Sequence, residues 1–339
     1  MSRPARPAEQ PIDPKGTRTG DRSGFVLIIA LVLLGLMATW ATHLHVSTRQ
    51  ARTSAHQQAV RARLRAALVD EAFNRLDALA ADPQPLFDHR DKYWLGTREV
   101  DRPEGLATKS QLTDLNQYLD LNNLWLPPDF PGQNITERVL QEVLVLSGDD
   151  APLERIVPLT AWMQPTEERD AALDFYAAAD PPYSAPGTAL LAWGEFQWIR
   201  GFEPGYWQPR PRTQVARPFE FNVIDLVTIL PGPRTRPVPV NINTAPLPLL
   251  EALFGPGHES AARYVALNRE ERPLRAIDPL EWLLPEPLFQ RLRPFITVRS
   301  SYVRLDAQAY LDGQYLSLYV LAERDTDGSV HIRHWSWRG

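Results

Sequence analysis

Two aspartates near the C-terminus carry the clearest metal-binding pattern in the chain. The run Asp325–Gly328 resembles the start of a calcium loop, in which carboxylates two residues apart bind one cation. A complete loop needs further oxygen ligands and a distal bidentate acid, but here the chain continues directly into Val330. A tight turn between strands uses the same residue types. We expect a hairpin turn, with Asp325 and Asp327 kept as candidates for a metal ion.

No pattern in the sequence predicts catalysis. The chain has no cysteine, which excludes disulfides, thiolate metal sites and cysteine nucleophiles. The signatures Gly-x-Ser-x-Gly, His-Glu-x-x-His and Gly-x-x-x-x-Gly-Lys are absent. His258, His331 and His334 stand outside any such signature. We therefore expect a non-enzymatic protein.

The segment Asn241–Pro246, followed by Gly255-Pro256-Gly257, could open a helix-hairpin-helix motif that holds DNA phosphates on backbone N–H groups. Thr244 is a good helix N-cap, which gives the segment a structural role instead. DNA binding needs a basic face, whereas acids offset the nearby arginines and the net charge of the 339 residues is −5. We expect a packing motif and no nucleic-acid partner.

A junction at Gly24-Phe25 separates a basic, proline-rich leader, residues 1–24, from an uncharged stretch that runs to Thr48. The prolines make a stable helix unfavourable in the leader. Roughly 20 helical residues cross the ~30 Å hydrocarbon layer, so residues 25–45 are long enough to span a membrane. Lys and Arg residues are equally frequent on both sides, so the positive-inside rule gives no orientation.

A cleavable secretory signal is the competing interpretation of this start. Such a signal has a shorter apolar core and a small-residue cut site, for which Thr39-Trp40-Ala41 is the available match. Here the apolar run is longer and continues into a helical pattern without a break. These features favour an N-terminal helix over 25–80 that is retained.

The helical pattern is an apolar stripe at three- to four-residue steps, formed by Val60, Leu64, Leu68, Phe73 and Leu76. We expect the helix to end before Asp82-Pro83, because proline disfavours the helical state in the residue before it. Residues 81–116 then read as the first part of a sheet, with strands around Tyr93–Leu95 and Ser110–Leu112 and a turn at Pro103–Gly105.

Residues 117–294 show apolar stretches of helical length broken by proline and glycine, which predicts a mostly helical inserted domain. The predicted helices are Ile135–Ser147, Leu153–Met163, Ala189–Ile199 and Pro246–Phe254.

Residues 295–339 change to strand periodicity. Alternation from Ile296 to Leu305, the hairpin signal Asp312-Gly313, and the runs Tyr315–Ala322 and Val330–Trp337 predict an antiparallel meander. The expected fold is α+β: a long N-terminal transmembrane helix, an antiparallel pilin-like sheet, and a large all-α domain inserted into the sheet region.

Four stretches, in this order, resemble the K-type minor pseudopilins of the bacterial type II secretion system (GspK). The first is Gly24-Phe25 with its apolar helix, which is similar to a prepilin junction. The second, Leu112 to Leu124, resembles the family's "DL...xLNxL" segment. The third and fourth, Val240–Pro246 and Thr297–Tyr302, resemble its NxNTA stretch and its last strands.

The resemblance implies that a prepilin peptidase cuts after Gly24 and that the new N-terminus, Phe25, is methylated. Most pilin-like subunits carry a glutamate at the fifth mature position, where this chain has Ile29. A carboxylate buried in lipid is costly unless it is paired, and a subunit at the tip lacks the neighbour that pairs it. The K-type family likewise lacks this glutamate, so the resemblance implies that Ile29 marks a tip position.

The function that the resemblance implies is non-enzymatic: a cap at the tip of the pseudopilus that helps to start its assembly for protein secretion. The implied partners are the I- and J-type minor pseudopilins, the prepilin peptidase and the inner membrane. The protein would cross the inner membrane once, with its globular part in the periplasm. Two alternatives stay open: a minor pilin of a type IV pilus or DNA-uptake system, and a membrane-tethered periplasmic binding protein or enzyme.

The chain departs from the family around Trp162. Some members place calcium among acids that flank the equivalent tryptophan, but here the stretch reads Thr160-Ala161-Trp162-Met163-Gln164. Calcium is therefore implied by the resemblance but not supported by these residues.

Overall fold

The computed structural model describes residues 20–127, 130, 132, 134–164, 170–202, 206, 222–232 and 235–338. The chain forms two compact units, Met1–Ala62 and Arg63–Gly339. One long helix, α1, spans Gly20–Ala80 and so belongs to both units. Most of the predicted leader, residues 1–19, lies outside the described residues. Its last residues, from Gly20, are helical, which corrects the expectation of a non-helical leader.

The apolar part of α1 lies in the first unit. Every large apolar side chain from Phe25 to Val46 is exposed, as a helix in a bilayer requires. Among the described residues this is the one helix that is long and apolar enough to cross a membrane. The hydroxyls of Thr39 and Thr42 donate to the carbonyls of Gly35 and Ala38, so no hydroxyl there is left to face lipid unpaired.

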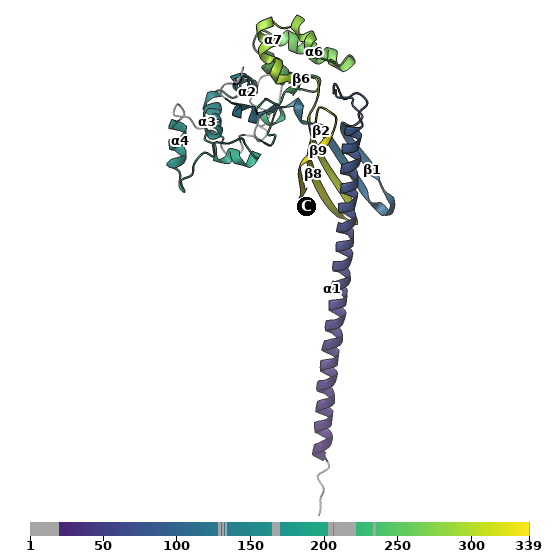
Figure 1. Cartoon of the computed structure of the whole chain (residues 1–339). Coiled ribbons are helices and arrows are strands. Elements are labelled where there is room, and N and C mark those ends of the chain that lie inside the picture. The colour runs from purple at the N-terminus through teal and green to yellow at the C-terminus, as the bar shows by residue number, and fades with distance from the viewer. Residues whose placement is uncertain are drawn as a thin grey trace, which may run out of the picture. The chain divides into compact units, whose positions relative to one another are not determined.

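The second unit contains a five-stranded sheet in the order β1-β2-β7-β8-β9, in which every neighbouring pair is antiparallel. The bounds are β1 Gly96–Asp101, β2 Ala107–Asp114, β7 Tyr302–Leu311, β8 Gln314–Arg324 and β9 Val330–Arg338. β2 and β7 lie side by side although residues 115–301 separate them in sequence. The inserted region therefore leaves and re-enters the sheet between two adjacent strands (Figure 1).

The C-terminal part of α1 packs on the sheet through a buried stripe that includes Leu64, Leu68, Leu76 and Leu79. Polar contacts fix the same interface, since Ser110 of β2 donates to Glu71 at 2.7 Å and Arg75 donates to the carbonyl of Gly96 at 2.6 Å. Phe73 was predicted in this stripe but is exposed, and Ala72 is buried beside it instead. α1 ends at Ala80, as the Asp82-Pro83 signal predicted.

The predicted meander is confirmed in β7, β8 and β9, including the hairpin at Asp312-Gly313, and the turn at Pro103–Gly105 is confirmed as a 3₁₀ turn. Two strand predictions are wrong. Tyr93–Leu95 precede β1 rather than lying in it. The run from Ile296 is not one strand, because β6 (Ile296–Thr297) pairs with β5 (Val240–Asn241) and the chain bends before β7 begins.

The inserted region holds six described α-helices, and most predicted helices match them. Ala189–Ile199 is the exception, because it forms only a 3₁₀ segment at Trp193–Trp198. The region is not purely helical, since β3 (Leu119–Asp120) pairs in parallel with β4 (Val227–Thr228), as β5 does with β6. The helices are α2 Asn134–Leu146, α3 Leu153–Met163, α4 Asp170–Ala177, α5 Leu247–Phe254, α6 Glu259–Glu271 and α7 Glu286–Leu292.

One large apolar core, from Leu119 to Val298, holds this region together. The α+β fold class, with its long helix, antiparallel sheet and further helices, is as predicted. The domain boundaries at residues 117 and 294 stay predictions.

Candidate functional site

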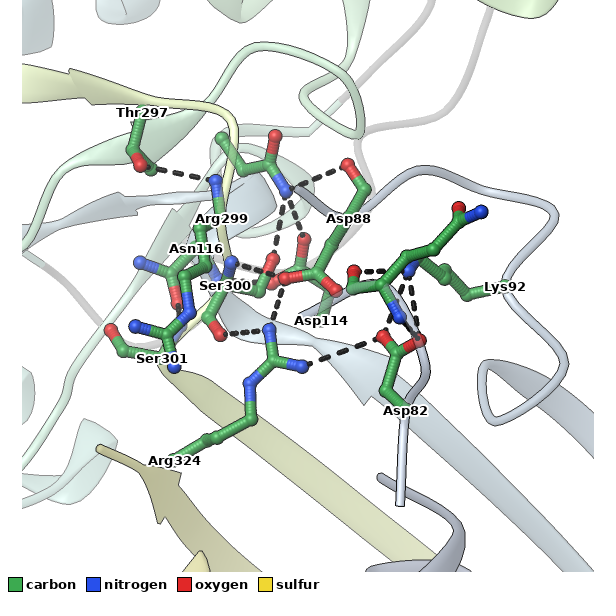
Figure 2. A network of polar contacts seen from close by, with 12 residues as sticks. Asp82, Asp88, Lys92, Asp114, Asn116, Thr297, Arg299, Ser300, Ser301 and Arg324 are labelled. Carbon is green, nitrogen blue, oxygen red and sulfur yellow. Dashed lines mark hydrogen bonds and ion pairs between the residues drawn. The ribbon is translucent and has the colours of Figure 1, made fainter. Parts of the chain in front are cut away.

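A buried chain of charges lies where the inserted region joins the sheet (Figure 2). Arg324, the last residue of β8, is fully buried and forms an ion pair with Asp88, which is also fully buried. The guanidinium also donates to the carbonyl of Ser300 at 2.8 Å and lies 3.7 Å from Asp82. Lys92 completes the chain, with its ammonium 2.8 Å from the Asp82 carboxylate. Two carboxylates and two cations, all buried and drawn from residues 82–92 and from the end of β8, thus neutralise one another.

The Asn241–Thr244 turn attaches the insert to this charged chain. The Asn241 amide donates to the Ser300 hydroxyl at 2.8 Å, and the Asn243 amide donates to the Asp88 carbonyl at 3.1 Å. The Thr244 hydroxyl donates to Asp114 at 2.5 Å. The prediction that Thr244 caps the following helix is therefore wrong, because the N-cap of α5 is Pro246. The Thr244 hydroxyl binds the carboxylate of Asp114, the last residue of β2, instead.

Asparagines of the Leu112–Leu124 segment form further hydrogen bonds to residues that are distant in sequence. Asn116 accepts from the backbone N–H groups of Ser301 and Tyr302, at 2.9 and 2.8 Å. These bonds explain the bend that separates β6 from β7. Asn122 donates to the carbonyls of Leu190 and Leu230 and accepts from the N–H of Leu190. Each asparagine thus fixes loops that are far away in sequence.

Burial dominates the electrostatics of this junction. It raises the pKa of Asp114, 2% exposed, from 3.8 to about 6, although hydrogen bonds from Ser300 and Thr244 oppose the shift. Burial also raises the pKa of Asp88, against the attraction of Arg324. Burial acts in the same direction on Asp82, but there the hydrogen bonds, first that of Lys92, outweigh it and the pKa is lowered.

We expect the free energy of unfolding to rise as the pH falls from about 7 to about 5, in part through Asp114. The native state holds the Asp114 proton up to about pH 6, whereas the unfolded chain releases it near 3.8. Between these values the native state binds more protons, so this contribution is lost as the pH rises through about 6. A shift of this size corresponds to on the order of 3 kcal/mol.

Urea unfolding of the full chain at several pH values measures this effect, with Asp114→Asn as the comparison. The variant has no titrating group at this position, so its stability should depend less steeply on pH between about 4 and 7. Asp82 does not interfere, because its lowered pKa places its own loss of stability at more acidic pH. Equal slopes in both proteins would contradict a titrating Asp114.

The other predicted site residues lie elsewhere. Gly24, Phe25 and Ile29 are in the first unit, on α1, where Ile29 is 43% exposed. Asp325 and Asp327 form the turn between β8 and β9: the Gly328 N–H donates to the Asp325 carbonyl, and the Ser329 N–H donates to the Asp327 carboxylate. The described part of the chain holds no group of three or more His, Asp or Glu side chains arranged for a metal ion.

The helix-hairpin-helix segment forms as a pair of packed helices, α5 and α6, joined at Gly255–His258. A DNA-binding hairpin offers its backbone N–H groups to phosphate. Here the Glu259 carboxylate accepts from the Gly257 N–H at 3.0 Å. This geometry supports the packing interpretation of the segment.

Sequence reasoning did not find the charged residues of the junction. Asp88, Lys92 and Arg324 stand in no recognisable motif, and 236 positions separate Asp88 from Arg324. Asn116, Asn122 and Asn241 lie in the segments that carry the family resemblance, which is the one signal that pointed to them. Because the charges are paired and buried, the arrangement suits fixing the insert on the sheet rather than binding a substrate.

No protein-family model and no curated protein matches this sequence. The fold matches a chain in the crystal structure of the GspK-GspI-GspJ complex from the enterotoxigenic Escherichia coli type 2 secretion system. The TM-score is 0.63 with 19% sequence identity, and the match covers 85% of this chain and 99% of that chain. The chain therefore has the pilin-like α+β fold that its resemblance to the K-type minor pseudopilins implied.

Proposed function

We propose that this protein is a non-enzymatic minor pseudopilin of the K type, which caps the pseudopilus of a type II secretion system and helps to start its assembly. The observation that carries this proposal is the large insert between the adjacent strands β2 and β7, in a fold shared with a chain of the GspK-GspI-GspJ complex. A subunit this bulky does not repeat easily along a narrow filament, so it suits the end of one.

The proposed setting is the inner membrane, crossed once by α1, with the sheet and the insert in the periplasm. The proposed partners are the I- and J-type minor pseudopilins and the prepilin peptidase. The small residues Ala30, Gly35 and Ala38 allow a neighbouring helix to come close. At Gly35 a Cβ atom would meet nothing within 4 Å, so this face of α1 is open to a partner helix.

Ile29 supports the terminal position. A glutamate at this point would sit on an exposed, apolar stretch of α1, where an unpaired carboxylate is costly in lipid. An apolar residue needs no neighbouring N-terminal amine and so tolerates a place without the next subunit. The junction described above fits the same role, because a cap must present its insert in a fixed position.

The phenotype of a deletion strain distinguishes this function from the two alternatives. A minor pilin of a type IV pilus or DNA-uptake system would, when deleted, impair twitching or transformation. A membrane-tethered binding protein or enzyme would leave both processes and secretion intact. Loss of secretion alone, together with co-purification of I- and J-type pseudopilins, supports the K-type role.

The Gly24→Val variant is expected to remain at precursor size, because a bulky residue before the cut is expected to block the prepilin peptidase. Gel mobility and N-terminal sequencing of membrane-extracted protein measure this. The wild-type protein should begin at Phe25 with a methylated amine. Ser23→Ala, one residue upstream, is the matched control and should mature normally.

A wild-type N-terminus near Thr42 would show instead that a signal peptide had been removed. Maturation of Gly24→Val to the wild-type size would likewise refute the proposed processing.

A further inference from the structure

Two arginines with no carboxylate partner lie side by side next to the Asn241–Ala245 turn. Arg269 of α6 donates to the carbonyl of Ile242 at 2.5 Å, and Arg90 donates to the carbonyl of Thr244 at 3.3 Å. Each guanidinium thus donates one hydrogen bond to the turn and retains further N–H groups. Carbonyls satisfy hydrogen bonds but do not neutralise the two charges.

Acidic side chains offset this positive charge only at a distance: Glu270 attracts Arg269 and lines the same cavity with Asp91, but neither pairs directly with Arg90 or Arg269. Arg269 is only 5% exposed, and its Nε has no hydrogen-bond partner. Burial, and then the charge of Arg90, lower the pKa of Arg269 to about 10. Among the described residues no carboxylate oxygen comes within 4.0 Å of either guanidinium, since the nearby Glu251 pairs with Arg263 and Asp91 lies by His89.

The two arginines line a cavity of about 250 Å³ together with Asn243, and also line a second cavity of about 450 Å³. Leu247, Ala266 and Leu267 form the apolar wall of the second cavity, and Leu267 is 72% exposed. Arg90, Arg269 and Glu270 are shared by both, so the two form one groove. We call it the basic groove; its charged end lies at Arg90 and its apolar end at Leu267.

We propose that the basic groove binds a peptide segment in which an aspartate or glutamate stands next to a large apolar residue. The carboxylate bridges Arg90 and Arg269, whose planar N–H groups suit carboxylate oxygens. The apolar side chain covers Leu267, which is otherwise exposed to water, and the half-buried Ala266 beside it. The proposal rests on these residues alone and does not depend on a role in secretion.

A bare oxyanion such as phosphate would satisfy the arginines but leave the apolar wall uncovered. Glu270 and Asp91, which also line the charged end, disfavour a doubly charged ion more than a single carboxylate. These two features select a carboxylate on an amphipathic segment over a free phosphate.

The test uses full-length protein in detergent and a fluorescein-labelled peptide, Gly-Ser-Glu-Leu-Ser-Gly, with binding followed by fluorescence anisotropy. Two matched peptides carry Gln in place of Glu, or Ser in place of Leu. We expect the first substitution to weaken binding about tenfold or more, as expected for loss of a charge-assisted contact. The second should weaken it about threefold to tenfold, and inorganic phosphate should not compete at concentrations that leave the ionic strength unchanged.

Protein variants separate the groove from general charge effects. Arg90→Gln keeps the fold, because Arg90 is exposed, and should weaken binding of the Glu-Leu peptide about tenfold. Leu267→Ser should reproduce the effect of removing the leucine from the peptide. Arg333→Gln changes the net charge equally but lies on β9 in a pair with Glu323, so binding should be unchanged.

The proposal is overturned if the Glu-Leu peptide does not bind, or if Arg90→Gln binds it as well as Arg333→Gln does. Competition by phosphate, with equal binding of the peptide that lacks leucine, would overturn it in favour of a site for bare anions.

Discussion

Replacing Arg324 with methionine should lower the free energy of unfolding by about 3–5 kcal/mol, the usual effect of removing one partner from a buried ion pair. The substitution keeps an unbranched apolar stem but removes the guanidinium, which leaves the fully buried Asp88 carboxylate without its cation. It also leaves the Ser300 carbonyl without its 2.8 Å donor. Urea unfolding of the full chain, followed by circular dichroism, measures the change.

Arg333→Met is the matched control, because it removes the same chemical group from the same sheet. Arg333 pairs with Glu323 at 2.6 Å, but its side chain is 48% exposed. Solvent screens this pair, so the expected loss is much smaller than that of Arg324→Met. Equal losses in the two variants would show that burial of the Arg324 pair has no energetic consequence.

A double variant, Arg324→Met with Asp88→Leu, tests the cause of the loss. If the cost comes from an unpaired buried carboxylate, removal of that carboxylate should recover part of the lost stability. The backbone carbonyl of Asp88, which accepts from the Asn243 amide, is retained in this variant. No recovery would indicate that other contacts account for the effect, either those of Arg324 or the 2.7 Å bond that the Ser300 N–H donates to the Asp88 carboxylate.

Elements that depend on local signals could be predicted from the sequence. The hairpin between β7 and β8 follows from Asp312-Gly313, whose positive φ angles of 51° and 73° suit a tight two-residue turn. The end of α1 follows from Asp82-Pro83, and α3 matches its predicted bounds, Leu153–Met163. In each case the neighbouring residues alone decide the conformation.

Elements that depend on distant partners could not be predicted in this way. The alternation from Ile296 to Leu305 is typical of one strand, but Asp88 and Asn116 bind the backbone at Ser300–Tyr302 and bend the chain. Thr244 has the residue type of an N-cap, yet its hydroxyl bonds to Asp114, which is 130 positions away. Residue types indicate what a side chain can bond to, whereas only the fold decides which partner it meets.

The buried asparagines lie between these two cases. The likeness of Leu112–Leu124 to a family segment marked Asn122 as a position of interest, but its role follows from three bonds to two distant loops. The amide substitutes for backbone partners that Leu190 and Leu230 lack in this fold. An amide in this setting belongs to the scaffold that fixes the insert rather than to a surface that binds a partner.

Replacing Asn122 with alanine should therefore lower the free energy of unfolding by about 3 kcal/mol or more. The N–H and C=O of Leu190 and the C=O of Leu230 would lose their partners in the interior, and each unsatisfied buried group costs about 1–3 kcal/mol. Urea unfolding of the full chain again provides the measurement. Asn122 is 1% exposed, so water does not readily replace the lost bonds.

Alanine variants of two further asparagines, which make fewer buried hydrogen bonds, provide a comparison for the loss of stability expected in Asn122→Ala. Asn123 makes two equivalent bonds, both to the backbone of Val238, so Asn123→Ala should cost about 2 kcal/mol. Asn268 donates to the Tyr264 carbonyl on an exposed face of α6, and Asn268→Ala should change stability by less than about 0.5 kcal/mol. The loss of stability should increase with the number of buried hydrogen bonds removed. A loss in Asn268→Ala as large as that in Asn122→Ala would contradict this expectation. The predicted order holds if the asparagine amides, rather than the apolar core around them, fix the loops of the insert.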